Sequence, residues 1–212
     1  LSGQSVCDDG LMIDLAPMRA VRVDPSRRLA RAGGGALLGD LDRETLAFGL
    51  VTTTGTVSHT GAGGLTLGGG FGRLARRYGL TCDQLTSVDI VTADGNLLEA
   101  SATANADLFW GLRGGGGNFG VATSLEYRLH PFDGWVTGGH LVFPFEQAGP
   151  ALRGFAQLYP RAPEGLWIEP ILTTMPGGGR ALILDVCCSD APAAADAALA
   201  PYRKLGNAVA DD

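Results

Sequence analysis

The residues of this sequence best suited to chemistry are the glycines and hydroxyl side chains between Gly55 and Gly72. Clustered glycines permit positive φ angles and let backbone amides approach a ligand without a Cβ in the way. Successive amides can then converge on an anion such as a phosphate. A tightly packed loop between strands is the alternative explanation for such a run. The stretch therefore predicts either a phosphate-containing ligand or close backbone packing.

Three phosphate-binding motifs compete for this role. A P-loop ends in Gly-Lys-Ser or Gly-Lys-Thr, and the sequence contains no Gly-Lys pair. The dinucleotide fingerprint GxGxxG occurs at Gly115–Gly120, but a predicted helix precedes it and a predicted strand comes after it. Because a Rossmann site needs strand, turn and helix in that order, a nicotinamide-binding fold is disfavoured. A flavin-dinucleotide site built from loops between short strands is the interpretation that remains.

The three histidines and four cysteines give no metal-ligand spacing, so we predict no metal site. His59 lies in the glycine-rich loop, where it could bond to a cofactor, a substrate or only the loop itself. We expect His130, next to Pro131, to be structural, and His140 to face either an active site or solvent. The cysteines form no CxxC motif and are expected to be buried in a mostly reduced protein; they are Cys7, Cys82, Cys187 and Cys188.

Composition restricts the class of protein. The 212 residues are 45% hydrophobic and 18% charged, with a mean hydropathy of +0.14, which indicates one large or two small folded domains. The net charge of -6 argues against a nucleic-acid partner, for which a basic face would be expected. The sequence shows no membrane-spanning segment or signal peptide, which favours a cytoplasmic location. Because it starts at Leu1 and stops without a terminal element, we expect a fragment, from which a targeting signal could be missing.

The elements expected around the glycine-rich stretch alternate between short strands and helices. In the first part we predict an ordered loop over 51–72, helices over 36–48 and 104–112, and strands over 11–14, 20–24, 29–32, 85–93, 97–99 and 121–129. A boundary is predicted at 130–134. Beyond it we predict helices over 146–159 and 191–205 and strands over 135–143, 166–174 and 181–187. This order favours an α+β fold.

Two long motifs resemble one flavoprotein superfamily. Residues 56–72 read TVSHTGAGGLTLGGGFG and are succeeded at 78–83 by YGLTCD, while residues 107–121 read DLFWGLRGGGGNFGV. In this order and at this separation they resemble the vanillyl-alcohol oxidase/p-cresol methylhydroxylase (PCMH) superfamily, and within it the berberine-bridge-enzyme-like group. The resemblance covers nearly the whole chain up to the final helix.

The resemblance implies a PCMH-type FAD-binding domain over 1–132, its N-terminal part missing, and then over 133–212 the first part of an antiparallel-sheet substrate domain. The glycine-rich loop would lie along the pyrophosphate, ribityl chain and isoalloxazine of FAD. The cofactor-binding residues implied there are Gly55, Thr56, Val57, Ser58, His59, Thr60, Gly61, Gly63, Gly64, Leu67 and Gly70. Gly120 and Val121 would approach the adenosine end through their backbone.

Three positions bear on how the flavin would be held. In this family a histidine of an Arg-Ser-Gly-Gly-His-like motif carries the flavin covalently, and Leu1–Gln4 resembles the residues directly after that motif. The histidine would then precede Leu1. Val57 stands where some relatives place a second, cysteine link, so at most one covalent bond is expected. Thr60 would face the N5/C4a edge, where its hydroxyl could bond to N5, steer oxygen, or only cap a turn.

The resemblance implies an FAD-dependent oxidase that passes a hydride to flavin N5 from an alcohol, an amine or a hydroxylated ring carbon, with dioxygen as acceptor, in bacterial secondary metabolism. In relatives the catalytic base comes from later strands. Glu169 and Tyr159 are ionisable candidates that their spacing does not distinguish from surface residues. The partners expected are a small-molecule substrate and dioxygen, and the oligomeric state has no signature. The alternatives are a non-catalytic fragment and a nucleotide-binding module without redox activity.

Overall fold

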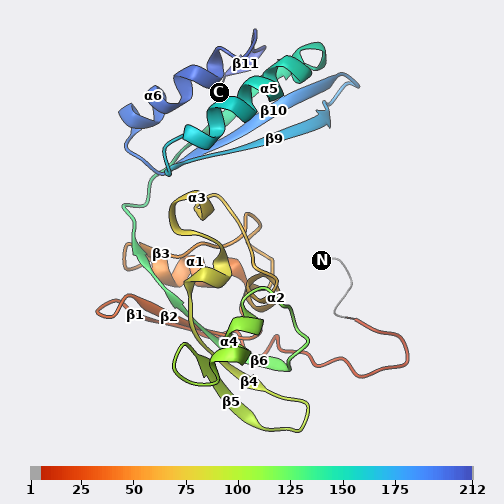
Figure 1. Cartoon of the computed structure of the whole chain (residues 1–212), viewed down its shortest axis with the longest axis vertical. Coiled ribbons are helices and arrows are strands. Elements are labelled where there is room, and N and C mark those ends of the chain that lie inside the picture. The colour runs from red at the N-terminus through yellow and green to blue at the C-terminus, as the bar shows by residue number, and fades with distance from the viewer. Residues whose placement is uncertain (1–5, 212) are drawn as a thin grey trace. The chain divides into compact units, whose positions relative to one another are not determined.

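The computed structural model describes residues 6–211, which form two compact units that divide between Gly134 and Trp135. Figure 1 shows both units along the chain. Each unit has its own antiparallel sheet and its own hydrophobic core. That the first unit is an FAD-binding domain and the second the start of a substrate domain stays a prediction.

The first unit is built on a five-stranded antiparallel sheet in the order β1-β2-β6-β4-β5. Its strands are β1 Val21–Asp24, β2 Leu29–Gly33, β4 Leu85–Val91, β5 Leu97–Ser101 and β6 Val121–Arg128, and a separate pair joins β3 Leu50–Val51 to β7 His130–Pro131. Its helices are α1 Leu38–Leu46, α2 Ala62–Leu67, α3 Ala75–Tyr78 and α4 Ala106–Leu112, with a 3₁₀ turn η1 at Thr81–Gln84. Because strand side chains alternate between faces, Val88 and Ile90 of β4 and Leu125 and Tyr127 of β6 point into one core, although irregularities in the β4–β6 register interrupt the alternation.

That core joins three helices to one face of the sheet. Leu41 of α1, Leu67 of α2 and Leu112 of α4 are buried in the same cluster as Leu125 and Tyr127 of β6. The helices therefore cover the face that carries the alternating apolar residues, and the opposite face carries charged ones such as the Arg31–Asp89 ion pair.

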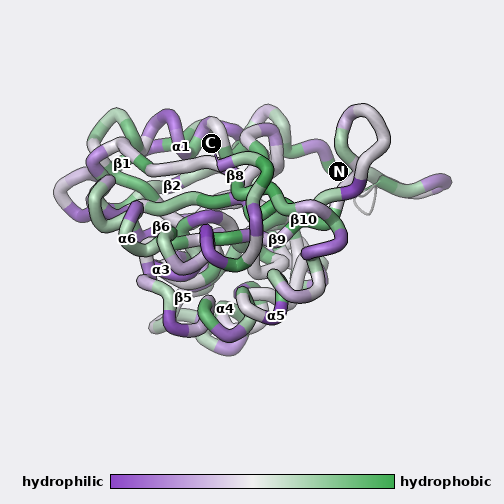
Figure 2. Tube along the Cα trace, turned by 90° about the horizontal axis from the view of Figure 1, so that it is seen from above, coloured by the Kyte–Doolittle hydropathy of each residue, from purple (hydrophilic) through white to green (hydrophobic). Residues whose placement is uncertain are grey.

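The second unit repeats this plan with four strands and two helices. The sheet order is β11-β8-β10-β9, with β8 Thr137–Pro144, β9 Leu166–Thr174, β10 Arg180–Cys188 and β11 Ala210–Asp211. Helices α5 Ala148–Leu158 and α6 Pro192–Arg203 lie on one face of this sheet, and the 3₁₀ turns are η2 Phe145–Gln147 and η3 Tyr159–Arg161 (Figure 1). Figure 2 shows the hydrophobic character of β8, whose Leu141 and Phe143 enter the core beneath these helices.

Two sequence expectations about the elements are wrong. Residues 11–14 form no strand, because no strand among residues 6–211 pairs with them, and Leu11 is 86% exposed. The stretch 51–72 is not all loop, since α2 occupies its middle. Its glycines lower helix propensity, so the helix depends on packing of Leu67 and Thr66 against the core rather than on local preference.

The run Gly33–Gly35 at the end of β2 supports the segment that precedes β1. A Cβ at Gly35 would collide with the carbonyl oxygen of Leu15, and the Gly35 amide donates to Met18 O at 3.0 Å. Because only a residue without a side chain permits this approach, the run fixes the path of residues 15–18 across the end of β2.

Candidate functional site

Helix α1 holds the glycine-rich loop by backbone hydrogen bonds at its N-terminal end. The amide of Leu38 donates to Thr60 O and that of Gly39 to Ser58 O, both at 2.9 Å. Just before the helix, Ala36 O accepts from the Ala62 amide at 2.8 Å. Three successive bonds of this kind fix the loop backbone from 58 to 62, so the exposed glycines in and after this segment are presented by a rigid support.

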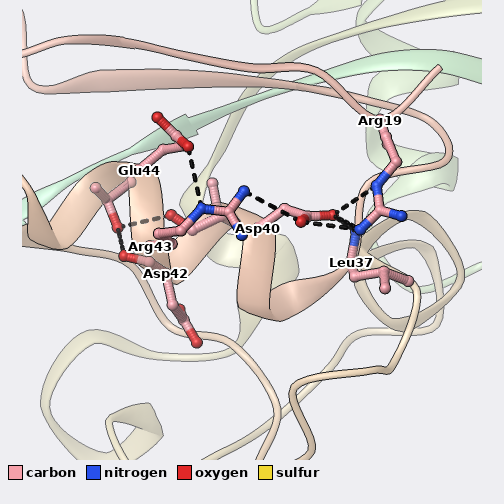
Figure 3. Close-up of polar contacts among 8 residues, drawn as sticks. Arg19, Leu37, Asp40, Asp42, Arg43 and Glu44 are labelled. Carbon is pink, nitrogen blue, oxygen red and sulfur yellow. Dashed lines mark hydrogen bonds and ion pairs between the residues drawn. The ribbon is translucent and has the colours of Figure 1, made fainter.

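The N-terminal end of α1 is itself fixed by Asp40. Its carboxylate accepts from the Leu37 amide at 3.1 Å and forms an ion pair with Arg19 at 2.8 Å, and Arg43 lies 3.3 Å away (Figure 3). Burial alone would raise the pKa of Asp40, but the Leu37 amide and Arg19 outweigh it and lower the pKa. Asp40 is thus a structural carboxylate, ionised at neutral pH, a role that its position in the sequence does not reveal.

The glycines of the loop fall into two kinds. At Gly61 and Gly64 an added Cβ would meet no atom within 4 Å, and both residues are exposed. At Gly70 (φ +71°) a Cβ would lie 2.6 Å from Thr81 Oγ1, and at Gly63 it would lie 3.1 Å from Gly34 O. Packing within the protein therefore explains glycine at 63 and 70. At 61 and 64 packing does not require glycine, so the backbone there is open to solvent.

The second glycine motif lies against the first. The Gly116 amide donates to Leu67 O at the end of α2, at 2.8 Å. Arg113 donates to Cys82 O and pairs with Asp83, both at 3.1 Å, while the Cys82 amide donates to Gly69 O at 2.8 Å. Residues 69–70, 81–83 and 113–116 are therefore joined in one hydrogen-bonded assembly, although 31 residues separate Cys82 from Arg113.

A buried hydroxyl pair ties α2 to the sheet. Tyr127 OH lies 2.8 Å from Thr66 Oγ1, and Thr66 Oγ1 donates to Ala62 O at 2.7 Å. Burial raises the pKa of Tyr127, with the Thr66 bond acting against it, so the phenol stays protonated at neutral pH. This pair was missed from the sequence, where Tyr127 was only one apolar residue of an alternating strand.

Several predicted site residues lie on the exposed part of the loop. Thr56, Val57, Ser58 and His59 are exposed, Thr60 is half-buried, and Gly55 lies at the base of the loop beside Leu65 and Leu38. The Thr60 amide closes a turn by donating to Val57 O at 3.0 Å. Leu67, by contrast, is buried in the core. That these residues contact FAD stays a prediction.

Gly120 and Val121 lie apart from the loop at the start of β6. Gly120 has φ +142°, and a Cβ there would collide with the Val91 carbonyl oxygen. Val121 pairs with Val91 in the sheet. Close packing against β4 therefore explains glycine at 120, and the predicted approach of both residues to adenosine is untested. The predicted resemblance of Leu1–Gln4 to a covalent-flavin motif lies outside the described residues.

The remaining ionisable candidates are held in different ways. His130 stacks on Tyr78 with ring centroids 3.9 Å apart, and its Nε2 lies 2.8 Å from Gln84 Oε1. Burial lowers the pKa of His130, and Arg128 and Arg28 lower it further. The imidazole of His130 is therefore held in place by neighbouring side chains, as expected for a structural residue.

In the second unit, His140 Nε2 of β8 lies 3.5 Å from Asp185 Oδ1 of β10. Glu169 of β9 is the cross-strand neighbour of Asp185. Tyr159 OH accepts from the Ile168 amide at 3.1 Å, which fixes the phenol against β9. Among residues 6–211 no three His, Cys, Asp or Glu side chains are grouped as metal ligands, and no helix described there is long and apolar enough to cross a membrane.

The chain is similar to known FAD-linked proteins. Residues 1–101 match the family described as FAD binding domain. The chain is 43% identical over 141 residues to an FAD-linked oxidoreductase of Dictyostelium discoideum, covering 66% of this chain and 31% of the relative. It is 37% identical over 142 residues to (R)-6-hydroxynicotine oxidase of Paenarthrobacter nicotinovorans, covering 67% and 31%. The chain thus spans about a third of the length of these curated relatives.

Among solved structures, 6-hydroxy-D-nicotine oxidase from Arthrobacter nicotinovorans is similar with a TM-score of 0.90 and 30% identity, covering 99% of this chain and 47% of that one. A berberine-bridge-enzyme-like protein of Arabidopsis thaliana is similar with a TM-score of 0.84 and 26% identity, covering 92% and 41%. The predicted α+β fold is confirmed by the first of these likenesses.

Proposed function

We propose, for a chain that carries a PCMH-type FAD-binding domain like those of FAD-linked oxidoreductases, that the whole protein oxidises a small organic substrate. The substrate class is an alcohol, an amine or a hydroxylated ring carbon, and dioxygen is the electron acceptor. The first unit, residues 1–134, is the FAD-binding domain in this proposal, and the second begins the substrate domain. The likeness to a relative named as an oxidase supports the choice of dioxygen.

One observation supports the proposal most directly: the open backbone at Gly61 and, in the first turn of α2, at Gly64, in a segment fixed to α1. These residues fit FAD, because no Cβ keeps its phosphates from their backbone amides. When bound, FAD supplies a two-electron acceptor. The chain's own contribution is to bind and orient it: residues 58–62 are fixed by Ala36, Leu38 and Gly39, and the two open glycines let the cofactor approach.

The test of the cofactor site compares glycine substitutions that the fold tolerates. Gly61→Ala and Gly64→Ala add a Cβ in open space, so the apoprotein should fold, and Gly64→Ala, which lies within α2, should be more stable by about 0.5–1 kcal/mol. We expect FAD affinity, measured by quenching of flavin fluorescence, to fall about tenfold or more for each variant. Gly179→Ala is the matched control, because its Cβ also meets no atom within 4 Å but lies in the β9–β10 turn. Wild-type FAD affinity in Gly61→Ala and Gly64→Ala would refute this assignment of the loop.

The redox part of the proposal has a separate test. The full-length protein should be yellow, and its flavin should lose its oxidised absorbance near about 450 nm when the substrate is added without oxygen. A screen of small alcohols and amines measures this directly, with oxygen consumption as the second readout. A protein that binds ADP as well as FAD and whose flavin no compound reduces would instead be a nucleotide-binding module.

Thr60 is the residue of the loop that we assign to reactivity rather than to binding. Its backbone is fixed at both ends, since its carbonyl accepts from Leu38 and its amide donates to Val57 O. The side chain of Thr60 is therefore attached to the loop at a fixed backbone position. We expect Thr60→Val to change the rate of oxygen consumption while FAD affinity stays within about twofold. Unchanged oxygen consumption and flavin spectra would refute a role of Thr60 in reactivity, and the residue would then serve only to form the turn with Val57.

A further inference from the structure

Asp42 lies on α1, the helix that supports the glycine-rich loop, but it does not take part in the ion pairs of that helix. Asp40, two residues earlier, faces Arg19 and Arg43, whereas the Asp42 carboxylate points away from them (Figure 3). The partner that Asp42 does have is the hydroxyl of Thr54, which lies 3.4 Å from Asp42 Oδ1 and 3.5 Å from its other acceptor, Gly55 O. Thr54 immediately precedes Gly55, so this contact reaches the base of the loop.

The environment of Asp42 is unusual for a helix carboxylate. Burial raises its pKa to about 6, and the Thr54 hydroxyl acts in the opposite direction. The charged neighbours on the same helix are engaged elsewhere, since Arg43 Nε lies 3.3 Å from Glu44 Oε1. From the loop, the one titratable side chain between residues 52 and 61 is His59, which is exposed. A half-buried carboxylate without a cation destabilises the fold, so packing alone does not explain it.

Thr54 occupies the point where the two ends of the loop cross. A Cβ at Gly72 would collide with the Thr54 carbonyl oxygen, so the end of the loop lies directly on its beginning. The neighbouring hydroxyls of Thr52 and Thr53 are buried and have no hydrogen-bond partner among the described residues. The Thr54–Asp42 bond is therefore the side-chain hydrogen bond by which residues 52–54 are attached to α1. A displacement of Thr54 would move both ends of the loop.

We propose that Asp42 is a positioning residue for the FAD-binding loop: through Thr54 it fixes the crossing of the loop ends, and so places Gly61 and Gly64 for the cofactor. The inference rests on the proposed function only in naming FAD as the ligand of the loop. It adds a residue that touches no cofactor and acts through Thr54.

The two protonation states of Asp42 have opposite effects on the loop and on the fold. A carboxylate accepts the Thr54 hydrogen bond more strongly than a neutral carboxyl does, so the loop is held best above pH 6. Folding stability behaves in reverse. Because the pKa is raised above 3.8, the contribution of Asp42 is fully present below pH 3.8 and is lost as pH rises through about 6. FAD affinity should therefore rise over a pH range in which stability falls, which a purely structural role does not produce.

The experiment measures FAD affinity and apoprotein stability from pH 5 to pH 8 in wild type, Asp42→Asn, Thr54→Val and the double variant. We expect wild-type affinity to rise about tenfold across this range. Asp42→Asn keeps a neutral acceptor, so its affinity should stay at the low-pH level, and its stability should no longer show the fall with rising pH that Asp42 causes. Thr54→Val should show the same loss, and the double variant no further loss. Glu44→Gln is the matched control on the same helix and should behave as wild type.

The positioning role of Asp42 would be overturned if Asp42→Asn and Thr54→Val bound FAD with wild-type affinity at every pH. It would also be overturned if their losses of FAD affinity were additive in the double variant. A readout without cofactor separates this inference from the proposed function. Amide hydrogen exchange of residues 54–62 in the apoprotein should be faster in Asp42→Asn than in Glu44→Gln. If wild type binds no FAD, the proposed function fails; if loop exchange is unchanged in Asp42→Asn, the positioning role fails.

Discussion

The buried pair of Thr66 and Tyr127 makes an asymmetric prediction about stability. A threonine hydroxyl has one proton, and that of Thr66 is donated to Ala62 O at 2.7 Å. Tyr127 must then be the donor in its 2.8 Å contact with Thr66 Oγ1. Both side chains are completely buried, so neither can exchange its partner for water. The loss in the free energy of unfolding therefore depends on which of the two hydroxyls is removed.

Thr66→Val leaves the Tyr127 hydroxyl as a buried donor without a partner, which costs about 1–3 kcal/mol. Tyr127→Phe removes that donor and leaves Thr66 bonded to Ala62 O, so the loss should be only about 0.5–1.5 kcal/mol. In the double variant no unpaired donor remains, and the loss should be smaller than the sum of the single ones. The free energy of unfolding should thus fall more in Thr66→Val than in Tyr127→Phe, and the double variant should lose less than the two single variants together.

The assay is urea denaturation of the apoprotein monitored by circular dichroism, with an unchanged slope as the sign that only stability has moved. Thr45→Val is the matched control. Thr45 is a buried helix threonine that donates to Leu41 O at 3.0 Å in the same way as Thr66 does to Ala62, but its hydroxyl bonds to backbone carbonyls rather than to a tyrosine. Its loss should stay below about 1 kcal/mol. A larger loss in Tyr127→Phe than in Thr66→Val would refute the assignment of donor and acceptor.

Three further outcomes are expected from other parts of the first unit. Gly72→Ala forces a Cβ against the Thr54 carbonyl oxygen, so thermal denaturation should show a loss of about 2 kcal/mol or more, and FAD titration should show weaker binding. His130→Gln should remove part of the acid sensitivity of the fold. The lowered pKa of His130 means that its contribution is present above pH 6.5 and lost as pH falls, which urea denaturation at several pH values measures. Arg19→Met should raise the pKa of Asp40 in an NMR titration, and so weaken the stabilisation that Asp40 provides above pH 3.8 and loses on acidification.

Much of the secondary structure could be predicted because it depends on local signals. The alternation of apolar residues identified β4 and β6, and the Asp94-Gly95 turn identified the hairpin between β4 and β5. The segment 11–14 was expected to be a strand but is not one, since a strand needs a neighbour whose backbone groups complete its hydrogen bonds. Helix α2 was missed for the opposite reason: its glycines disfavour a helix locally, and contacts with β6 stabilise it.

In the glycine-rich loop, residue order and folding carry different kinds of information. The resemblance carried by two glycine motifs at a fixed separation was enough to predict the FAD-binding domain, which the match of residues 1–101 confirms, because such a motif is a property of residue type and order. Only the folded chain distinguishes open glycines from packed ones, as at Gly61 and Gly70, since the distinction depends on neighbours distant in sequence. Asp42 is the clearest case. In the sequence it is one of several charges on an exposed-looking helix, and only the folding of Thr54 against α1 turns it into a half-buried carboxyl beneath the loop.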